Sequence, residues 1–337
     1  MNILQLAKFN HHYYHGGIER ISKSIEKKIN CETYFAPNLS LESCRNILRL
    51  SKKIFNSREK ILLIVHSPSV WFVMILIFSI KKNVKIIIFR HCILSSFKAF
   101  YNSLETFLTK RFNKKFFLLS TSPNVAKGKN YAELFSNLET ESFDSNFEKR
   151  NHFIFVGRDS WYKNIPFLFE IYSNYFSKHG NLKLIFCSND NSRYKKFIKK
   201  NSLPEDSVEF ISNISDSELT ALLNKSKALL FPSNFSEEAF GIVQIEAIKC
   251  GCPLIANNIP NSGVGWIQKN SQKKIGILHE LDQNNKQNWL DSLIYFDKIQ
   301  KDEFEEISFN CYDYSSQFSE EKFIEKLTCF YKSIKFD

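Results

Sequence analysis

The sequence predicts an α/β protein with two tandem domains, each built on a parallel sheet between layers of helices. Short apolar runs alternate with amphipathic helical patterns along the chain, as expected of parallel sheets covered on both faces. The length of 337 residues suits two domains, and 43% hydrophobic with 24% charged residues excludes disordered and fibrous proteins. Both domains are expected to be Rossmann-like, with ligands beyond the carboxyl ends of the strands. We therefore expect a ligand cleft between the domains.

The first half begins with a strand, a polar loop and an amphipathic helix. The strand is expected at residues 3–7 and the helix at residues 18–29. Short apolar runs then predict buried strands at residues 61–65, 84–89 and 116–120. A polar stretch without periodicity at residues 139–150 is the expected linker between the domains.

The second half repeats this alternation more clearly. Its strands are expected at residues 153–156, 182–187, 208–211, 228–231 and 253–256. One helix is expected to begin at Ile165-Pro166, because proline in the first turn loses no hydrogen bond. Another is expected after Ser215, which forms a capping box with Glu218.

The positive charge is concentrated in the first half of the chain. Residues 1–150 hold 24 Lys and Arg against 11 Asp and Glu, whereas the remainder holds 22 against 24. This asymmetry predicts that one domain meets an anionic partner, namely nucleic acid, a phosphorylated substrate or an anionic membrane face. The abundance of Phe, Lys, Ile and Asn also fits AT-rich coding bias, which would leave part of the basicity without a partner.

The cellular compartment follows from the cysteines and the apolar segments. The eight cysteines are scattered and form no C-x-x-C pair, which favours free buried thiols in a reducing compartment. The start of the chain does not resemble a signal peptide. The apolar stretch at residues 61–80 is interrupted by His66-Ser67-Pro68-Ser69, so it is too short to span a bilayer. A cytoplasmic protein is the expectation.

Two constellations carry the chemistry. In the first, the strand at 153–156 leads into Gly157-Arg158 and, five positions later, Lys163. A guanidinium and an ammonium in one loop suit the neutralisation of a diphosphate leaving group, although solvated surface cations are the alternative.

In the second constellation, Glu238 lies in the loop before a helix that starts near Gly241, and Glu246 lies in that helix. The glycine would let a ligand approach the backbone, and the N–H groups of the first turn favour phosphate. A carboxylate such as that of Glu246 suits the vicinal hydroxyls of a ribose. The alternative is that both glutamates are ordinary surface charges.

Together these segments resemble the family 4 retaining glycosyltransferases, which have the GT-B fold. The resemblance rests on Glu238-Ala239-Phe240-Gly241 to Glu246, on Gly157-Arg158 to Lys163, and on Gly16-Gly17-Ile18-Glu19-Arg20, which occur in family order. It implies an acceptor-binding domain at residues 1–145, a nucleotide-sugar-binding domain at 146–315, and a C-terminal helix in 316–337 that crosses back to the first domain. Asn164 and Ala239 stand where the family usually has glycine.

The resemblance also implies a role for each matching residue. Catalysis would involve Glu238, which holds the donor sugar, His91 beside the reacting carbon, and Arg158 and Lys163 on the diphosphate. Donor binding would use the remaining matched positions: Gly16, Gly17, Phe240, Gly241, Ile242 and Glu246. His66 is a weaker histidine candidate. The family needs no metal or other cofactor, and we expect the histidine-rich segment at residues 11–15 to be a polar loop.

The implied function is transfer of a hexose or N-acetylhexosamine from a nucleoside-diphosphate sugar, with retention of configuration. The acceptor would be a lipid-linked glycan in bacterial O-antigen or capsule synthesis, and the enzyme would rest on the anionic inner face of the plasma membrane. One alternative is a sugar-nucleotide epimerase or hydrolase of the same fold. The other is a non-enzymatic, basic protein that binds nucleic acid or membranes, but the chain has no RNP-type aromatic signature or zinc motif.

Overall fold

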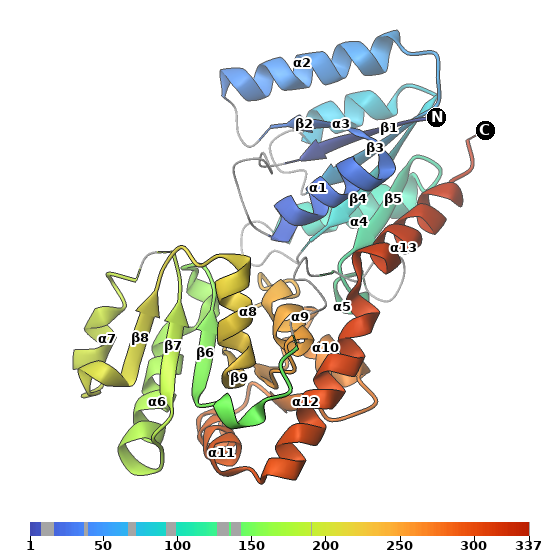
Figure 1. Cartoon of the computed structure of the whole chain (residues 1–337). Helices are drawn as coiled ribbons and strands as arrows, with labels where there is room; N and C mark the ends of the chain where they lie inside the picture. The colour runs from blue at the N-terminus through green and yellow to red at the C-terminus, as the bar shows by residue number, and fades with distance from the viewer. Residues whose placement is uncertain are drawn as a thin grey trace. The chain divides into compact units, whose positions relative to one another are not determined.

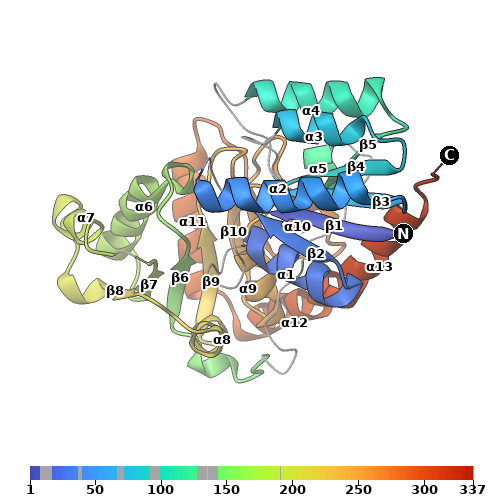
Figure 2. The ribbon, with the colours of Figure 1, turned by 90° about the horizontal axis from the view of Figure 1, so that it is seen from above.

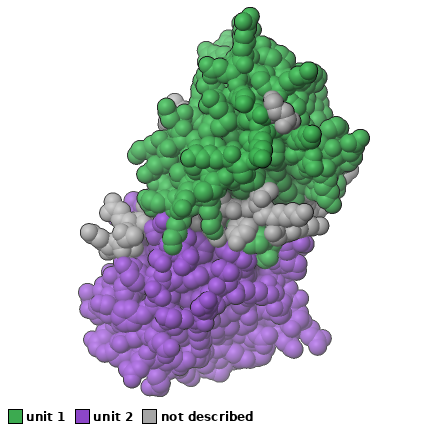
Figure 3. Space-filling view, turned by 90° about the vertical axis from the view of Figure 1, so that its right-hand side faces the viewer, with its two compact units in different colours: residues 1–134, 320–337 green, residues 135–319 purple. Residues whose placement is uncertain are grey.

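The computed structural model is shown in Figure 1. It divides into two compact units: unit 1 comprises residues 1–134 and 320–337, and unit 2 comprises residues 135–319 (Figure 3). The expected boundaries after residues 145 and 315 thus fall at 134 and 319 instead. The structure describes residues 1–7, 17–36, 40–66, 72–91, 99–126, 135, 143–189 and 191–336.

Unit 1 is built on a five-stranded parallel sheet with the strand order β2-β1-β3-β4-β5. Four of its strands were predicted, and each lies within one residue of the expected bounds. The fifth, β2, was not predicted because its four residues begin with a charged and a polar side chain. The strands are β1 (Asn2–Ala7), β2 (Glu32–Phe35), β3 (Ile61–His66), β4 (Val84–Arg90) and β5 (Phe116–Ser120).

Helices cover both faces of this sheet (Figures 1 and 2). On one face, α2, α3 and α4 pack on the strands, and on the other α1 packs against β1 and against α13. Helix α2 begins after Ser40, whose hydroxyl accepts a hydrogen bond from the Ser43 N–H. The helices are α1 (Gly17–Ile29), α2 (Leu41–Asn56), α3 (Phe72–Ser79), α4 (Ala99–Arg111), α5 (Pro123–Ala126) and α13 (Glu320–Lys332).

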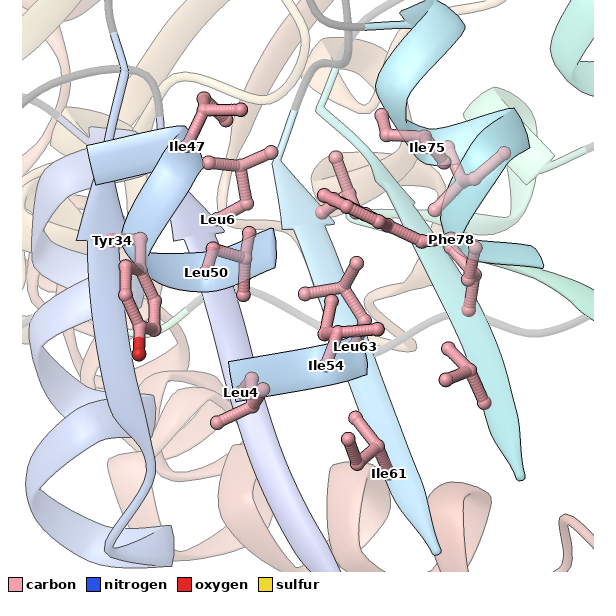
Figure 4. Close-up of a cluster of buried hydrophobic side chains, with 14 of the residues drawn as sticks. Leu4, Leu6, Tyr34, Ile47, Leu50, Ile54, Ile61, Leu63, Ile75 and Phe78 are labelled. Carbon is pink, nitrogen blue, oxygen red and sulfur yellow. The ribbon is translucent and has the colours of Figure 1, made fainter. Parts of the chain in front are cut away.

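Alternation along the strands decides which side chains reach each face. Leu4 and Leu6 of β1 face α2, whereas Gln5 between them points to the opposite face and bonds to the Ser22 carbonyl of α1. The apolar side chains on the α2 face form one buried cluster with residues of α2, α3 and α4 (Figure 4). Members of this cluster include Ile47, Leu50 and Ile54 of α2, Ile75 and Phe78 of α3, and Leu108 of α4.

Helix α13 is the last helix of the chain and belongs to unit 1, whose other helices come from its first half. Its Phe323 ring stacks on Phe89 of β4 with 6.4 Å between ring centroids. Glu320, its first residue, forms an ion pair of 3.5 Å with Lys28 of α1. Beyond the helix, the Lys335 carbonyl accepts a hydrogen bond from Lys85 of β4. The C-terminal segment is therefore a structural part of unit 1.

Unit 2 has a six-stranded parallel sheet with the order β11-β10-β9-β6-β7-β8. The five predicted strands are confirmed, with bounds that differ by at most two residues. The sixth, β11, was not predicted because it has only four residues and begins with glycine. The strands are β6 (His152–Val156), β7 (Lys183–Cys187), β8 (Val208–Ile211), β9 (Ser226–Phe231), β10 (Leu254–Asn257) and β11 (Gly276–His279).

The helices of unit 2 follow the predicted start signals. Helix α6 begins at Ile165 with proline in its first turn, and the Ser215–Glu218 capping box opens α8. The α-helices are α6 (Ile165–Lys178), α7 (Lys195–Lys200), α8 (Asp216–Asn224), α9 (Ile242–Lys249), α10 (Val264–Asn270), α11 (Asn285–Lys298) and α12 (Lys301–Ser315). The 3₁₀ helices are η3 (Phe147–Lys149), η4 (Trp161–Lys163), η5 (Glu205–Ser207) and η6 (Ser316–Phe318).

The expected linker at residues 139–150 is wrong over its second half, and residues 139–142 lie outside the described residues. Arg150 is buried and donates hydrogen bonds to the carbonyls of Ser226 (3.1 Å) and Cys250 (2.8 Å). Phe147 is also buried, and its ring lies 5.5 Å from the Arg150 guanidinium. Arg150 therefore anchors this segment to the start of β9 and the end of α9.

A buried histidine makes the stability of unit 2 depend on pH. Burial lowers the pKa of His152 from 6.5 to about 4. Between these pH values the unfolded chain binds a proton that the folded protein does not, so stability falls as the pH is lowered from about 6.5 toward 4. The slope from one such group approaches about 1.4 kcal/mol per pH unit. Burial lowers the pKa of His279 to about 4 as well, in the same direction.

Urea unfolding followed by tryptophan fluorescence at several pH values between 7 and 4.5 measures this slope. We expect His152→Gln to reduce the slope of the unfolding free energy against pH by the amount that corresponds to about one proton, whatever its effect on stability at pH 7. His179→Gln is the control, because His179 is exposed. An unchanged slope in the His152 variant would mean that another group causes the pH dependence.

Candidate functional site

The first predicted loop leaves β6 at Gly157 and ends in η4. The Lys163 side chain at the end of η4 is buried, and a Cβ placed on Gly157 would lie only 3.3 Å from the Lys163 Cε atom. The next residue, Asn164, has a φ of 52° in the left-handed region and caps α6. Asparagine tolerates this conformation better than most residues, so the turn forms here without a glycine.

Lys163 forms a buried ion pair with Glu238, across two loops that follow neighbouring strands. The Lys163 Nζ atom lies 2.5 Å from Glu238 Oε2, and the two residues are 7% and 8% exposed. The Ser233 hydroxyl donates to the same carboxylate oxygen at 3.0 Å. The Phe231 ring lies 4.5 Å from the ammonium. Lys163, predicted to bind the diphosphate, and Glu238, predicted to bind the sugar, are thus in direct contact.

Helix α9 begins beside this pair. Its N-cap Gly241 has a φ of 76°, and a Cβ there would lie 2.4 Å from the Phe231 ring. Ile242 starts the helix, and the buried Glu246 lies four residues further along. The Gln244 N–H donates to the Gly241 carbonyl at 2.9 Å, whereas the N–H groups of Ile242 and Val243 precede the first helical hydrogen bond and are available to an anion. The helix places Glu246 about one turn from the predicted phosphate site.

Polar side chains that were not predicted hold the loop after β9 in place. The Ser262 hydroxyl bonds to the Glu238 carbonyl and caps the Val264 N–H of α10 at 3.2 Å. Asn257, at the end of β10, donates to the carbonyls of Pro232 (3.0 Å) and Ser233 (3.1 Å). The only sequence signal for Asn257 is its position after a predicted apolar strand.

Arg158 differs from Lys163 in its surroundings. Its side chain is exposed, and within the described part of the chain it has no hydrogen bond or ion pair. The adjacent Asp159 is paired with Arg193 instead. Trp161 of η4 and Phe235 of the β9 loop are exposed, with ring centroids 4.5 Å apart. The structure therefore brings Lys163 and Glu238 together, whereas the Arg158 guanidinium is exposed to solvent.

The predicted residues of unit 1 form a separate group. Gly16 lies outside the described residues, and Gly17 is the first residue of α1. His91 follows β4 and is buried, with its Nε2 atom 2.8 Å from Nδ1 of His66. The two predicted histidines are therefore hydrogen-bonded partners. The predicted ligand cleft between the domains stays a prediction.

The whole chain has the fold of known glycosyltransferases. The glycosyltransferase of Rickettsia africae ESF-5 superposes with a TM-score of 0.73 at 17% identity, covering 99% of this chain and 98% of that chain. Anabaena HepE, solved with UDP and glucose, gives 0.65 at 15% identity, covering 99% and 100%. The chain therefore has the GT-B fold, as predicted.

Residues 138–295, within unit 2, match the family described as Glycosyl transferases group 1. The O-antigen chain mannosyltransferase RfbU of Salmonella typhimurium LT2 is 29% identical over 127 residues, or 38% of this chain. The D-rhamnosyltransferase WbpZ of Pseudomonas aeruginosa is 27% identical over 115 residues, or 34% of this chain. The matches span 35% and 29% of the lengths of these relatives.

Proposed function

We propose that the protein is a family 4 retaining glycosyltransferase that transfers a hexose or N-acetylhexosamine from a nucleoside-diphosphate sugar. The proposed acceptor is a lipid-linked glycan of bacterial surface polysaccharide. Support comes from the group 1 domain and from the resemblance to an O-antigen mannosyltransferase and a rhamnosyltransferase. WaaG, described as a glycosyltransferase of lipopolysaccharide biosynthesis, has the same fold, with a TM-score of 0.60 at 13% identity over 96% of this chain.

The observation that carries the proposal is the buried Lys163–Glu238 pair beside the start of α9. Without a ligand, the two charges neutralise each other in a site where a single charge would be costly. A donor sugar diphosphate supplies an anion for Lys163 and hydroxyl donors for Glu238, so each member of the pair gains a partner of the chemistry it needs. Glu246 would then hold the ribose of the nucleotide.

The proposed reaction proceeds by departure of the diphosphate and attack on the same face of the sugar. Arg158, Lys163 and the N–H groups of Phe240, Gly241 and Ile242 would meet the charge that develops on the leaving oxygen. The departing diphosphate can take the proton from the acceptor hydroxyl, so no separate base is needed. We propose that the reaction requires no metal or other cofactor, because cationic side chains supply the charge stabilisation.

Arg158 is exposed and has no ion pair with a described residue, so its substitution tests donor binding without disturbing the fold. We expect Arg158→Ala to weaken binding of the preferred nucleoside diphosphate by about 10- to 100-fold, the loss of one charged hydrogen-bond donor. The free energy of unfolding should change by less than about 0.5 kcal/mol. Calorimetric titration with UDP, GDP and ADP measures the affinity.

Lys183→Ala is the matched control, since Lys183 is an exposed cation at the amino end of β7, the opposite edge of the same sheet. It should bind like the wild type. Equal affinity in both variants would contradict a diphosphate at Arg158. Conversion of the sugar nucleotide without any acceptor would instead favour the epimerase or hydrolase alternative.

We further propose that unit 1 rests on the anionic cytoplasmic face of the plasma membrane. Large apolar side chains are exposed on α3 and beyond its end, with Val73 at 67% and Ile80 at 78%. Similar side chains are exposed on α2 and α4, which cover the same face of the sheet: Leu48, Phe55, Phe100 and Phe107.

Cations accompany the apolar side chains of α2, where Arg45, Arg49 and Lys52 are also exposed. Apolar side chains flanked by cations fit an anionic lipid surface. No helix in the described ranges is long and apolar enough to cross a bilayer.

Vesicle sedimentation tests this surface. We expect the wild type to bind phosphatidylglycerol vesicles more strongly than phosphatidylcholine vesicles. Val73→Glu/Ile80→Glu should reduce binding at least about tenfold, because each change removes an apolar side chain that would enter the lipid and adds a charge that the anionic lipid repels. Leu281→Glu in unit 2 replaces another exposed apolar residue and should have no effect. Binding unaffected by the double change would exclude this face.

A further inference from the structure

A row of buried polar side chains crosses the sheet of unit 1 on the face covered by α1 and α13. Gln5 of β1 lies opposite Ile64 of β3, and His66 of β3 lies opposite Phe89 of β4. Because side chains alternate along each strand, Gln5, His66 and His91 all point to this face. Polar groups buried in an otherwise apolar layer need hydrogen-bond partners.

The three side chains form a continuous chain of hydrogen bonds. Gln5 Nε2 donates to the Ser22 carbonyl at 3.0 Å and to the Thr33 hydroxyl at 2.9 Å. Gln5 Oε1 lies 2.7 Å from His66 Nε2. His66 Nδ1 lies 2.8 Å from His91 Nε2. The Phe89 ring stacks on the His91 ring with 4.6 Å between centroids, which fixes the plane of the imidazole.

The fixed end of these hydrogen bonds sets the direction of the Gln5–His66 bond, and a neutral His66 then sets the direction of the next one. A backbone carbonyl only accepts, so the amide nitrogen of Gln5 must face Ser22 and the amide oxygen must face His66. His66 must then donate from Nε2, and a neutral imidazole that carries its proton on Nε2 accepts at Nδ1. His91 must therefore donate from Nε2. Its own Nδ1 is left as a lone pair.

We propose that Gln5 and His66 are positioning residues that hold His91 as the neutral tautomer protonated on Nε2, so that His91 offers only a hydrogen-bond acceptor. Burial supports the neutral form, because it lowers the pKa of His91 to about 3. Resting on the proposed function, this assigns His91 the task of orienting a sugar hydroxyl through Nδ1. It excludes His91 as the acid that protonates the leaving group.

Nitrogen NMR of the ligand-free protein labelled with ¹⁵N-histidine reads the tautomer directly. The His91 signals are identified by their loss in His91→Asn. We expect both His66 and His91 to carry a proton on Nε2 and none on Nδ1, unchanged between pH 5.5 and 8. A proton on Nδ1 of His91, or an imidazolium in this range, overturns the proposal.

A substitution of Gln5 tests whether the Gln5–His66–His91 hydrogen bonds, the relay, hold the proton of His91 on Nε2. In Gln5→Glu, the carboxylate favours a charged His66 that donates from both nitrogens, so His91 must accept at Nε2 and its proton must move to Nδ1. Thr33→Val is the control, because it removes one bond of Gln5 and leaves the acceptor toward His66. An unchanged His91 spectrum in a folded Gln5→Glu protein refutes the relay.

Activity separates this inference from the proposed function. If the protein is the proposed transferase, Gln5→Glu should lower kcat at least about tenfold, because Nδ1 becomes a donor, and Thr33→Val should not. The NMR experiment needs no substrate, so it decides the tautomer of His91 even if the proposed reaction is wrong. A moved proton with unchanged kcat would refute the role of His91 in orienting the sugar.

Discussion

Removing Lys163 alone is expected to cost both stability and activity. Lys163→Met leaves the Glu238 carboxylate buried, with the Ser233 hydroxyl as its one remaining hydrogen-bond partner among the described residues, and such an unpaired charge costs about 3–5 kcal/mol. Transfer should fall at least about 100-fold, because a cation that stabilises the leaving diphosphate is lost. Urea unfolding and turnover with the preferred donor measure the two effects.

A double variant separates the two roles of Lys163. Lys163→Met/Glu238→Gln replaces the ion pair by neutral side chains of similar size, which often costs little stability. We expect its free energy of unfolding to lie within about 1.5 kcal/mol of the wild type while activity stays lost. If the double variant were as unstable as the single one, the cost would come from packing rather than from the charge. Trp161, Trp266 and Trp289 lie in unit 2 and report its unfolding.

Gly241→Ala is expected to damage the site through the backbone. At a φ of 76°, an alanine pays roughly 1–2 kcal/mol for the left-handed conformation. Its Cβ would also overlap the Phe231 ring, which adds about 1–3 kcal/mol. Because that ring supports the Lys163 ammonium, its displacement should also weaken donor binding at least about tenfold. Thermal unfolding and calorimetric titration with the donor measure these losses.

The partner variant Gly241→Ala/Phe231→Leu distinguishes the two causes. A smaller side chain at position 231 relieves the overlap but leaves the backbone strain. We expect it to recover about half of the lost stability and little of the lost affinity, since the leucine offers no ring to Lys163. Full stability in the single variant would contradict the requirement for glycine at this position.

Strand periodicity and cap residues made most of the fold predictable. Five buried runs in the second half became β6 to β10, and Gly241 begins α9 as expected. The strands β2 and β11 were missed because four residues at a sheet edge carry too little alternation. Arg150 was assigned to a linker because its carbonyl partners, at Ser226 and Cys250, are distant in sequence.

The site was predictable in its residue types but not in its pairings. The spacing of Glu238 and Glu246 placed both near the start of α9. That Lys163 would bind Glu238 rather than solvent depends on how two loops 75 positions apart in sequence meet, and the Ser233 and Asn257 contacts depend on the same packing. For the histidines, the strand order that puts β3 between β1 and β4 was needed to connect them.

Because α13 follows unit 2 in the sequence, unit 1 cannot be completed during synthesis until all of unit 2 has been translated. Unit 2 is a single continuous segment of the sequence and can fold first, although it is translated later than most of unit 1. Until then, Phe89 and the neighbouring face of the nascent sheet lack the cover of Phe323. The emerging chain must therefore shield this apolar surface, by chaperones or by α1 alone, while residues 135–319 are translated.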